Sequence, residues 1–245
     1  MSRFDLGNLW KDVYTKDELE EMAVAINERY FPERLERPKP FDAYLFLDLL
    51  GFNYEWDLLS PGPQISAMTF FSDGGWYIWD RPSYFPGDKP HFKTFKKGTV
   101  VVNSTFLSSK GLRKSEAFAV THEGCHIIKD KRYFKAHPRE ISTVFKVNDC
   151  KRKYWDGSTP TVELIERQND YLTAAVIMPK EQIKAAFFKS MRYKNIPDEP
   201  IGFELFMKKH IATLAKAYDL NFNVILYRLQ EIGVLADCEK EDGEK

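Results

Sequence analysis

The stretch FAVTHEGCHIIKD, residues Phe118 to Asp130, carries the strongest structural signal in the chain. It contains two of the five histidines, His122 and His126, four positions apart, and Glu123 directly follows the first. On a helix, residues four apart lie on one face, so both imidazoles can point at a common site. The apolar residues around the pair are typical of a buried helix. The spacing therefore indicates two ligands of one metal ion.

Zinc is the metal that this pattern favours, because a histidine pair on one helix turn is a common part of zinc sites. Glu123 points beside such an ion, where its carboxylate can accept a proton from an activated water. We therefore predict a Zn²⁺ cofactor and Glu123 as the catalytic general base. Gly124 is unexpected here, since glycine inside a helix costs about 1 kcal/mol relative to alanine. Cys125 is interpreted as a small core residue, because its direction differs from that of the histidines.

A catalytic zinc site needs a third protein ligand, and the segment TVELIERQNDYLTAAVIMP offers one. Glu166 and Asp170 lie four apart on the helical stripe of this segment. A glutamate on a stripe meant for the core is costly to bury unless it is paired or bound to metal. We predict Glu166 as the third ligand and Asp170 as an acceptor that orients a ligand histidine. A solvated acidic face, with Glu163 as a member and as the competing ligand, remains open.

The three other histidines are weaker candidates. His91 lies in a proline-rich segment, His137 precedes a proline, and His210 lies in the C-terminal helical region. Each is interpreted as an ordinary surface residue.

Helical and strand periodicities divide the chain into helices, a small sheet and further helices, so the predicted class is α+β. Thr15 and Glu18 predict a capping box for the first helix. Strands are expected at 66–71, 75–80 and 98–103, in one small sheet, with 81–97 as a loop or edge insertion. The predicted helices cover about 15–30, 40–51, 115–130, 160–178, 180–193 and parts of 201–236.

This organisation predicts a first domain over residues 1–194, a C-terminal helical element over 195–237 and a disordered tail over 238–245. Thirty-six basic residues balance 36 acidic ones, which argues against general binding to nucleic acid or to anionic membranes. No apolar run is long enough for a membrane span, and Cys125, Cys150 and Cys238 do not form a disulfide framework. These features indicate a cytoplasmic protein.

Taken together, HEGCH and the later ERQNDYLTAAVIMP resemble the ImmA/IrrE family of metallo-endopeptidases. The similarity extends over residues 15 to 236, and the C-terminal part is similar to the helix-turn-helix-like element that often follows the peptidase core. The resemblance implies a minimal zincin fold, zinc ligands at His122, His126 and Glu166, and Glu123 as general base. Asp170 matches the acidic or amide position four residues after the third ligand.

The resemblance also implies a protein substrate, a helix-turn-helix transcriptional repressor, whose cleavage releases mobile-element or stress-response genes. The sequence departs from the common pattern in three places. Cys125 replaces a frequent glycine, Asn169 replaces a small residue, and an arginine usually found ahead of Phe118 is missing. None of these departures removes a ligand, but the missing arginine bears on substrate preference.

Two other functions are open at this point. A non-catalytic, zinc-stabilised anti-repressor binding protein would use the same ligands, although the intact Glu123 argues against it. A DNA-binding regulator would need a basic C-terminal element. Across residues 201–237 the basic side chains Lys208, Lys209, Lys216 and Arg228 are offset by Glu204, Asp219, Glu231 and Asp237. We therefore expect this element to pack or to dock a substrate, not to bind nucleic acid.

Overall fold

The computed structural model describes residues 6, 13–62, 64–82, 86–108, 113–137, 143–145 and 161–236. Within these residues the fold contains eight α-helices and two small sheets, which confirms the α+β class. The helices are α1 (Lys16–Tyr30), α2 (Ala43–Leu49), α3 (Arg113–Lys129), α4 (Lys131–Ala136), α5 (Thr161–Ile177), α6 (Lys180–Ser190), α7 (Met207–Tyr218) and α8 (Phe222–Glu231), with 3₁₀ turns η1 (Pro32–Leu35) and η2 (Ser104–Ser108). The strands are β1 (Asn53–Asp57), β2 (Ile65–Phe70), β3 (Gly74–Ile78), β4 (His91–Phe95), β5 (Thr99–Asn103) and β6 (Thr143–Phe145).

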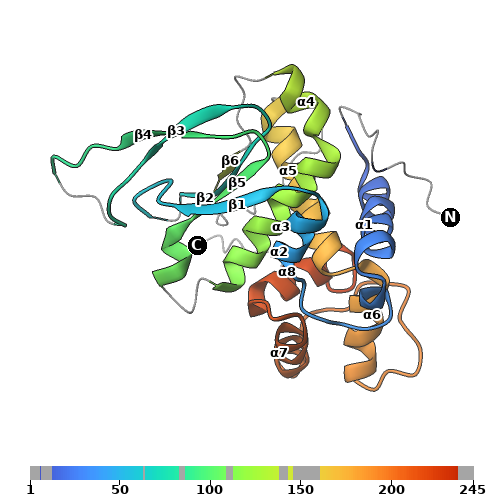
Figure 1. Cartoon of the computed structure of the whole chain (residues 1–245). Coiled ribbons are helices and arrows are strands. Elements are labelled where there is room, and N and C mark those ends of the chain that lie inside the picture. Colours follow the sequence, from blue (N-terminus) through green and yellow to red (C-terminus); the bar gives the residue numbers. More distant parts are fainter. Residues whose placement is uncertain are drawn as a thin grey trace, which may run out of the picture.

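The main sheet has the order β1-β5-β2-β6, with β1 parallel to β5 and the other pairs antiparallel. Successive side chains of β2 point to opposite faces. Ala67 belongs to the large core beneath the helices, whereas Met68 and Phe70 belong to a second core with Ile78 and Phe95 from the β3–β4 hairpin. The hairpin therefore covers the face of the sheet opposite the helices, and its far end extends away from them (Figure 1).

The expectation of one sheet for the strands near 66–71, 75–80 and 98–103 is wrong. Within the described residues β3 pairs only with β4, and the two form a separate two-stranded sheet. The segment 81–97, expected as a loop or edge insertion, contains the strand β4. Its three prolines all precede His91, so no ladder donor is missing from β4 itself. β1 was not expected from the sequence pattern.

Helix boundaries follow local chemistry. Thr15 and Glu18 form the predicted capping box of α1. α2 begins after Asp42, whose side chain accepts a hydrogen bond from the Leu45 N–H at 3.0 Å, and not at Pro40 as expected. Pro179 follows the end of α5, as its restriction on the preceding residue predicts.

The helices build one continuous core on the other face of the sheet. α3 packs on β2 and β5, and α2 and α5 pack against α3. The C-terminal helices join this core through buried residues such as Ile211, Leu214 and Leu229. The domain boundary at residue 194 stays a prediction, and the expected tail at 238–245 lies outside the described residues.

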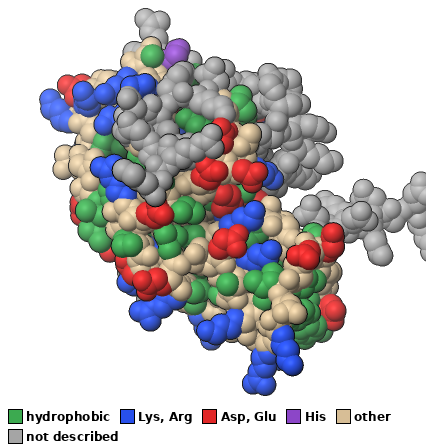
Figure 2. All heavy atoms as spheres, turned by 90° about the vertical axis from the view of Figure 1, so that its right-hand side faces the viewer, with side chains coloured by type: hydrophobic (Ala, Val, Ile, Leu, Met, Phe, Trp, Pro, Cys, Tyr) green, Lys and Arg blue, Asp and Glu red, His purple; other side chains and the backbone are tan. Residues whose placement is uncertain are grey.

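None of the described helices is sufficiently long and apolar to cross a membrane. On the face turned toward the viewer in Figure 2, acidic and basic side chains are interspersed.

Candidate metal centre

The described residues bring His122, His126 and Glu166 together from two helices. α3 supplies both histidines and α5 supplies the glutamate. The two helices are tied at this level by Asn169, whose side-chain amide donates to the His122 carbonyl at 2.8 Å. Both histidines are completely buried, and the Glu166 side chain is 17% exposed. Glu166 is therefore the most exposed of the three side chains.

Three potential ligand atoms converge. The Nε2 atoms of His122 and His126 are 2.9 Å apart, and they lie 3.1 and 3.3 Å from Oε2 of Glu166. These atoms form a cluster that can hold a metal ion. Two imidazole nitrogens and one carboxylate oxygen are also the donor set of catalytic zinc sites, so the residues present fit the metal that the sequence predicted.

The other nitrogen of each ring faces a carboxylate. His122 Nδ1 lies 3.0 Å from Oδ1 of Asp170, and His126 Nδ1 lies 2.7 Å from Oδ2 of Asp130. His126 Nδ1 is hydrogen-bonded to Asp130, and a proton there leaves the lone pair on Nε2 free for a metal, whereas the approach of Asp170 to His122 Nδ1 lacks hydrogen-bond geometry. Asp170 still lies where an acceptor for a ligand histidine was expected.

Opposite charges set the protonation of the cluster. Burial raises the pKa of Glu166, but the two imidazoles outweigh this effect and hold it at about 2. Burial lowers the pKa of His122, but Asp170 and Glu166 outweigh it and raise the value to about 10. The pKa of His126 is also raised, because Glu166 and Asp130 outweigh burial. A metal ion entering the site must therefore displace protons from the imidazoles.

Glu123 follows His122 on α3, and its side chain contacts the sheet. The Thr69 hydroxyl on β2 donates to its Oε2 at 2.5 Å, while its Oε1 is buried and has no hydrogen-bond partner within the described residues. Burial raises the pKa of Glu123, against the opposing effects of His126, His122 and Thr69. One oxygen is thus held in place and the other is available to a proton donor.

The two unusual residues of HEGCH have separate explanations. A Cβ at Gly124 would lie 2.6 Å from the Phe46 ring of α2, so glycine lets the two helices approach closely. Cys125 is completely buried, and burial raises its thiol pKa to about 12. Cys125 is therefore a core residue, as expected, and a poor metal ligand.

The alternative ligands do not join the cluster. Glu163 is exposed and pairs with Arg167 on its own helix. His91 lies on β4 near Asp80, His137 ends α4, and His210 contacts Ser190 from α7.

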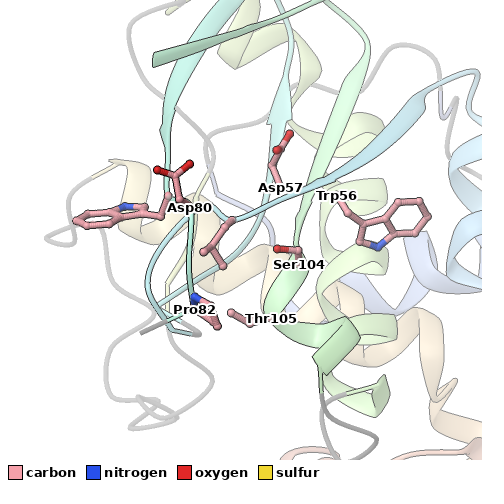
Figure 3. A pocket seen from close by; sticks show the side chains of 8 residues that line it. Trp56, Asp57, Asp80, Pro82, Ser104 and Thr105 are labelled. Atoms are coloured by element: carbon pink, nitrogen blue, oxygen red, sulfur yellow. The ribbon is translucent and has the colours of Figure 1, made fainter. Parts of the chain in front are cut away.

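A cavity of about 340 Å³ lies elsewhere, at the ends of β1 and β3. It is lined by Trp56, Asp57, Leu58, Trp79, Asp80, Pro82, Ser104 and Thr105. The Asp57 carboxylate is already paired with Lys93 at 2.7 Å, and the Trp56 indole points away from Asp80 (Figure 3). None of the converging ligand atoms lines this cavity, so it is separate from the candidate centre.

Sequence reasoning missed Thr69 and Asp130. Asp130 lies four residues after His126, so helix spacing could have revealed it. Thr69 is 54 residues from Glu123 and on a strand, and no local pattern indicates their contact.

Comparison with known proteins agrees with the geometry. No curated protein matches the chain. The sequence model of the M78 peptidase family, described as the IrrE N-terminal-like domain, matches residues 85–230, which is more than half of the chain. This match includes HEGCH and Glu166, and it confirms the resemblance noted from those motifs; the wider similarity from residue 15 stays a prediction. The chain therefore belongs to the M78 family of metallopeptidases, with a His-His-Glu cluster in its peptidase domain.

Proposed function

We propose that the protein is a zinc-dependent endopeptidase of minimal zincin fold, with His122, His126 and Glu166 as the zinc ligands and Glu123 as the general base. The observation that carries this proposal is the convergence of two Nε2 atoms and one carboxylate oxygen beside a buried carboxylate with a free oxygen. A purely structural metal site has no need of such a carboxylate, because its ligands close the coordination sphere.

The chain's own residues supply the proton transfers. When bound, zinc would polarise the scissile carbonyl and lower the pKa of water at the site to about 7. Oε1 of Glu123 accepts the proton of the attacking water, while the Thr69 hydroxyl holds Oε2 in place. Because burial raises the pKa of Glu123, the carboxylate is a stronger base once ionised, and after accepting the proton it can donate it to the leaving amine.

Membership of a peptidase family implies a protein substrate. We propose that this substrate is a helix-turn-helix transcriptional repressor, which rests on the ImmA/IrrE resemblance. We also propose that residues 195–237 dock the substrate and do not bind DNA. Arg228 is completely buried, where it bonds Glu20, so it cannot contact a phosphate backbone. The exposed Lys208, Lys209 and Lys216 are accompanied by the exposed Glu204 and Asp219 on the same element, which leaves little of the positive field that DNA binding requires.

The deciding experiment compares the parent with Glu123→Gln. Both proteins, loaded with zinc, are incubated with a native lysate of the source cells, and new protein N-termini are identified by mass spectrometry. We expect the parent alone to produce new termini, with helix-turn-helix proteins among the cleaved species, and a chelator to abolish them. Elemental analysis should find equal zinc in both proteins, because Glu123 is not a ligand.

Cleavage by Glu123→Gln at the parent rate would refute the mechanism. A non-catalytic anti-repressor would instead retain a repressor in a stable complex without producing fragments. Cleaved proteins of unrelated folds would keep the peptidase assignment and reject the repressor as substrate.

A further inference from the structure

Asp130 stands at the junction of α3 and α4, in the N-cap position of α4. Aspartate is favoured there because its carboxylate accepts from the first free backbone N–H groups of the helix, which typically stabilises by about 1 kcal/mol. The Asp130 side chain makes no such capping bond. Its carboxylate points to other partners, so α4 lacks the stabilisation that a capping bond from Asp130 would give.

Both oxygens of that carboxylate accept hydrogen bonds from side chains of α3. Oδ2 accepts from His126 Nδ1 at 2.7 Å, and Oδ1 accepts from Lys129 Nζ at 2.6 Å. The side chains are almost fully buried: 6% of Asp130 and 1% of Lys129 is exposed. The Lys129 ammonium also lies 5.9 Å from the centre of the Tyr14 ring, ahead of α1. A lysine is almost never buried so completely unless it is paired, because its charge loses hydration.

The two histidines of the candidate centre are thus supported differently. The Asp170 side chain beside His122 is 59% exposed, so water competes for it. The carboxylate beside His126 is buried and neutralised by an adjacent cation. Geometry held by a buried, charge-balanced pair is more rigid than geometry held at the surface.

We propose that Lys129 and Asp130 form a positioning pair for His126, an inference that rests on the proposed zinc function. Asp130 fixes the proton of His126 on Nδ1, so that Nε2 presents its lone pair beside Glu166. Lys129 donates to the other oxygen of Asp130 and so holds the carboxylate in its buried position. Neither residue contacts substrate; both act through the ligand.

The test measures the zinc affinity of the purified full-length chain by competition with a chromogenic chelator, and separately the thermal unfolding of the metal-free protein. Asp130→Asn keeps the size of the side chain but removes its charge, and we expect zinc binding to weaken about 10- to 100-fold. The double variant Lys129→Met/Asp130→Asn removes the unpaired ammonium as well. It should recover metal-free stability relative to Asp130→Asn and still bind zinc weakly.

Glu231→Gln is the matched control, because it breaks another buried ion pair, with Arg228, away from the ligands. It should lower metal-free stability and leave the zinc affinity unchanged. Parent-like zinc affinity in both Asp130 variants would overturn the inference and reduce the pair to a structural ion contact. A parent that binds no zinc would instead reject the proposed function itself.

Discussion

Gly124 gives the sharpest test of how the helix carrying the histidines is held. On helix propensity alone, Gly124→Ala should stabilise the protein by about 1 kcal/mol. The structure predicts the opposite sign. The added Cβ would lie 2.6 Å from two carbons of the Phe46 ring, whereas carbon atoms pack best at about 3.5–4.0 Å. One of the two helices must therefore move, or the ring must turn.

Phe46 has little freedom to give way. It is fully buried, and its ring centroid lies 5.8 Å from Tyr30, 6.0 Å from Phe31 and 5.4 Å from Phe41. Overpacking a core of this kind typically costs about 1–3 kcal/mol, and a displacement near 1 Å belongs at the upper end. After subtracting the propensity gain, we expect a net loss of about 1–2 kcal/mol. In a chain of 245 residues this lowers the unfolding midpoint by about 2–4 °C per kcal/mol.

Chemical and thermal unfolding of the parent, Gly124→Ala, Phe46→Leu and the double variant would measure this effect. Leucine at position 46 makes room for the new methyl group, so the double variant should be more stable than the sum of the single changes predicts. Zinc affinity should also fall in Gly124→Ala, because a displaced α3 moves both histidines. A stabilised Gly124→Ala protein, or strictly additive changes, would refute the close approach of α2 to α3.

Two further predictions concern the site. Thr69→Val removes the donor that holds Glu123, and because a hydrogen bond to a charged group contributes about 1.5–3 kcal/mol, kcat should fall about 10- to 100-fold. The acid limb of the pH–rate profile should move to higher pH in Thr69→Val. Thr69→Ser keeps the hydroxyl and should keep most of the rate. A Thr69→Val enzyme with an unchanged rate and pH profile would exclude a role for Thr69 in holding Glu123. In the metal-free protein, the raised pKa of His122 stabilises the fold below about pH 6.5, and this contribution is lost as the pH rises through about 10. The free energy of unfolding of the metal-free protein should therefore fall between pH 7 and pH 9.5, by up to about 1.4 kcal/mol per pH unit for one proton. The zinc-loaded protein should lack this slope, and a flat profile without metal would contradict the assigned protonation.

Much of the candidate centre follows from local spacing. His122 and His126 share a helix face because four residues make about one turn, and Glu166 and Asp170 do so for the same reason. The capping box at Thr15 and the end of α5 before Pro179 are equally local, because backbone donors and steric limits act within a few residues. Composition and periodicity also predicted the α+β class.

The sheet was harder to predict, because strand pairing joins residues far apart in the chain. β3 and β4 enclose a long segment with three prolines, and nothing local indicates that Gly75 opposes Thr94. β1 pairs with β5 across more than 40 positions, Asn53 with Thr99. Strand partners depend on which apolar side chains must be buried. Here the β3–β4 hairpin buries Met68 and Phe70 of β2.

The sequence by itself determined the candidate ligands of this protein: two histidines and a following glutamate on one helix turn, and an acidic pair on another. Only the tertiary structure decided what surrounds that chemistry. The orientation of α5 brings Glu166, and not Glu163, to the two histidines, and the sheet places Thr69 against Glu123. The side chain of Asp130 contacts His126 on α3 and does not cap α4. The tertiary structure also explained Gly124 by the ring of Phe46. These relations depend on the contact between separate elements, which packing fixes only after each helix and strand has formed.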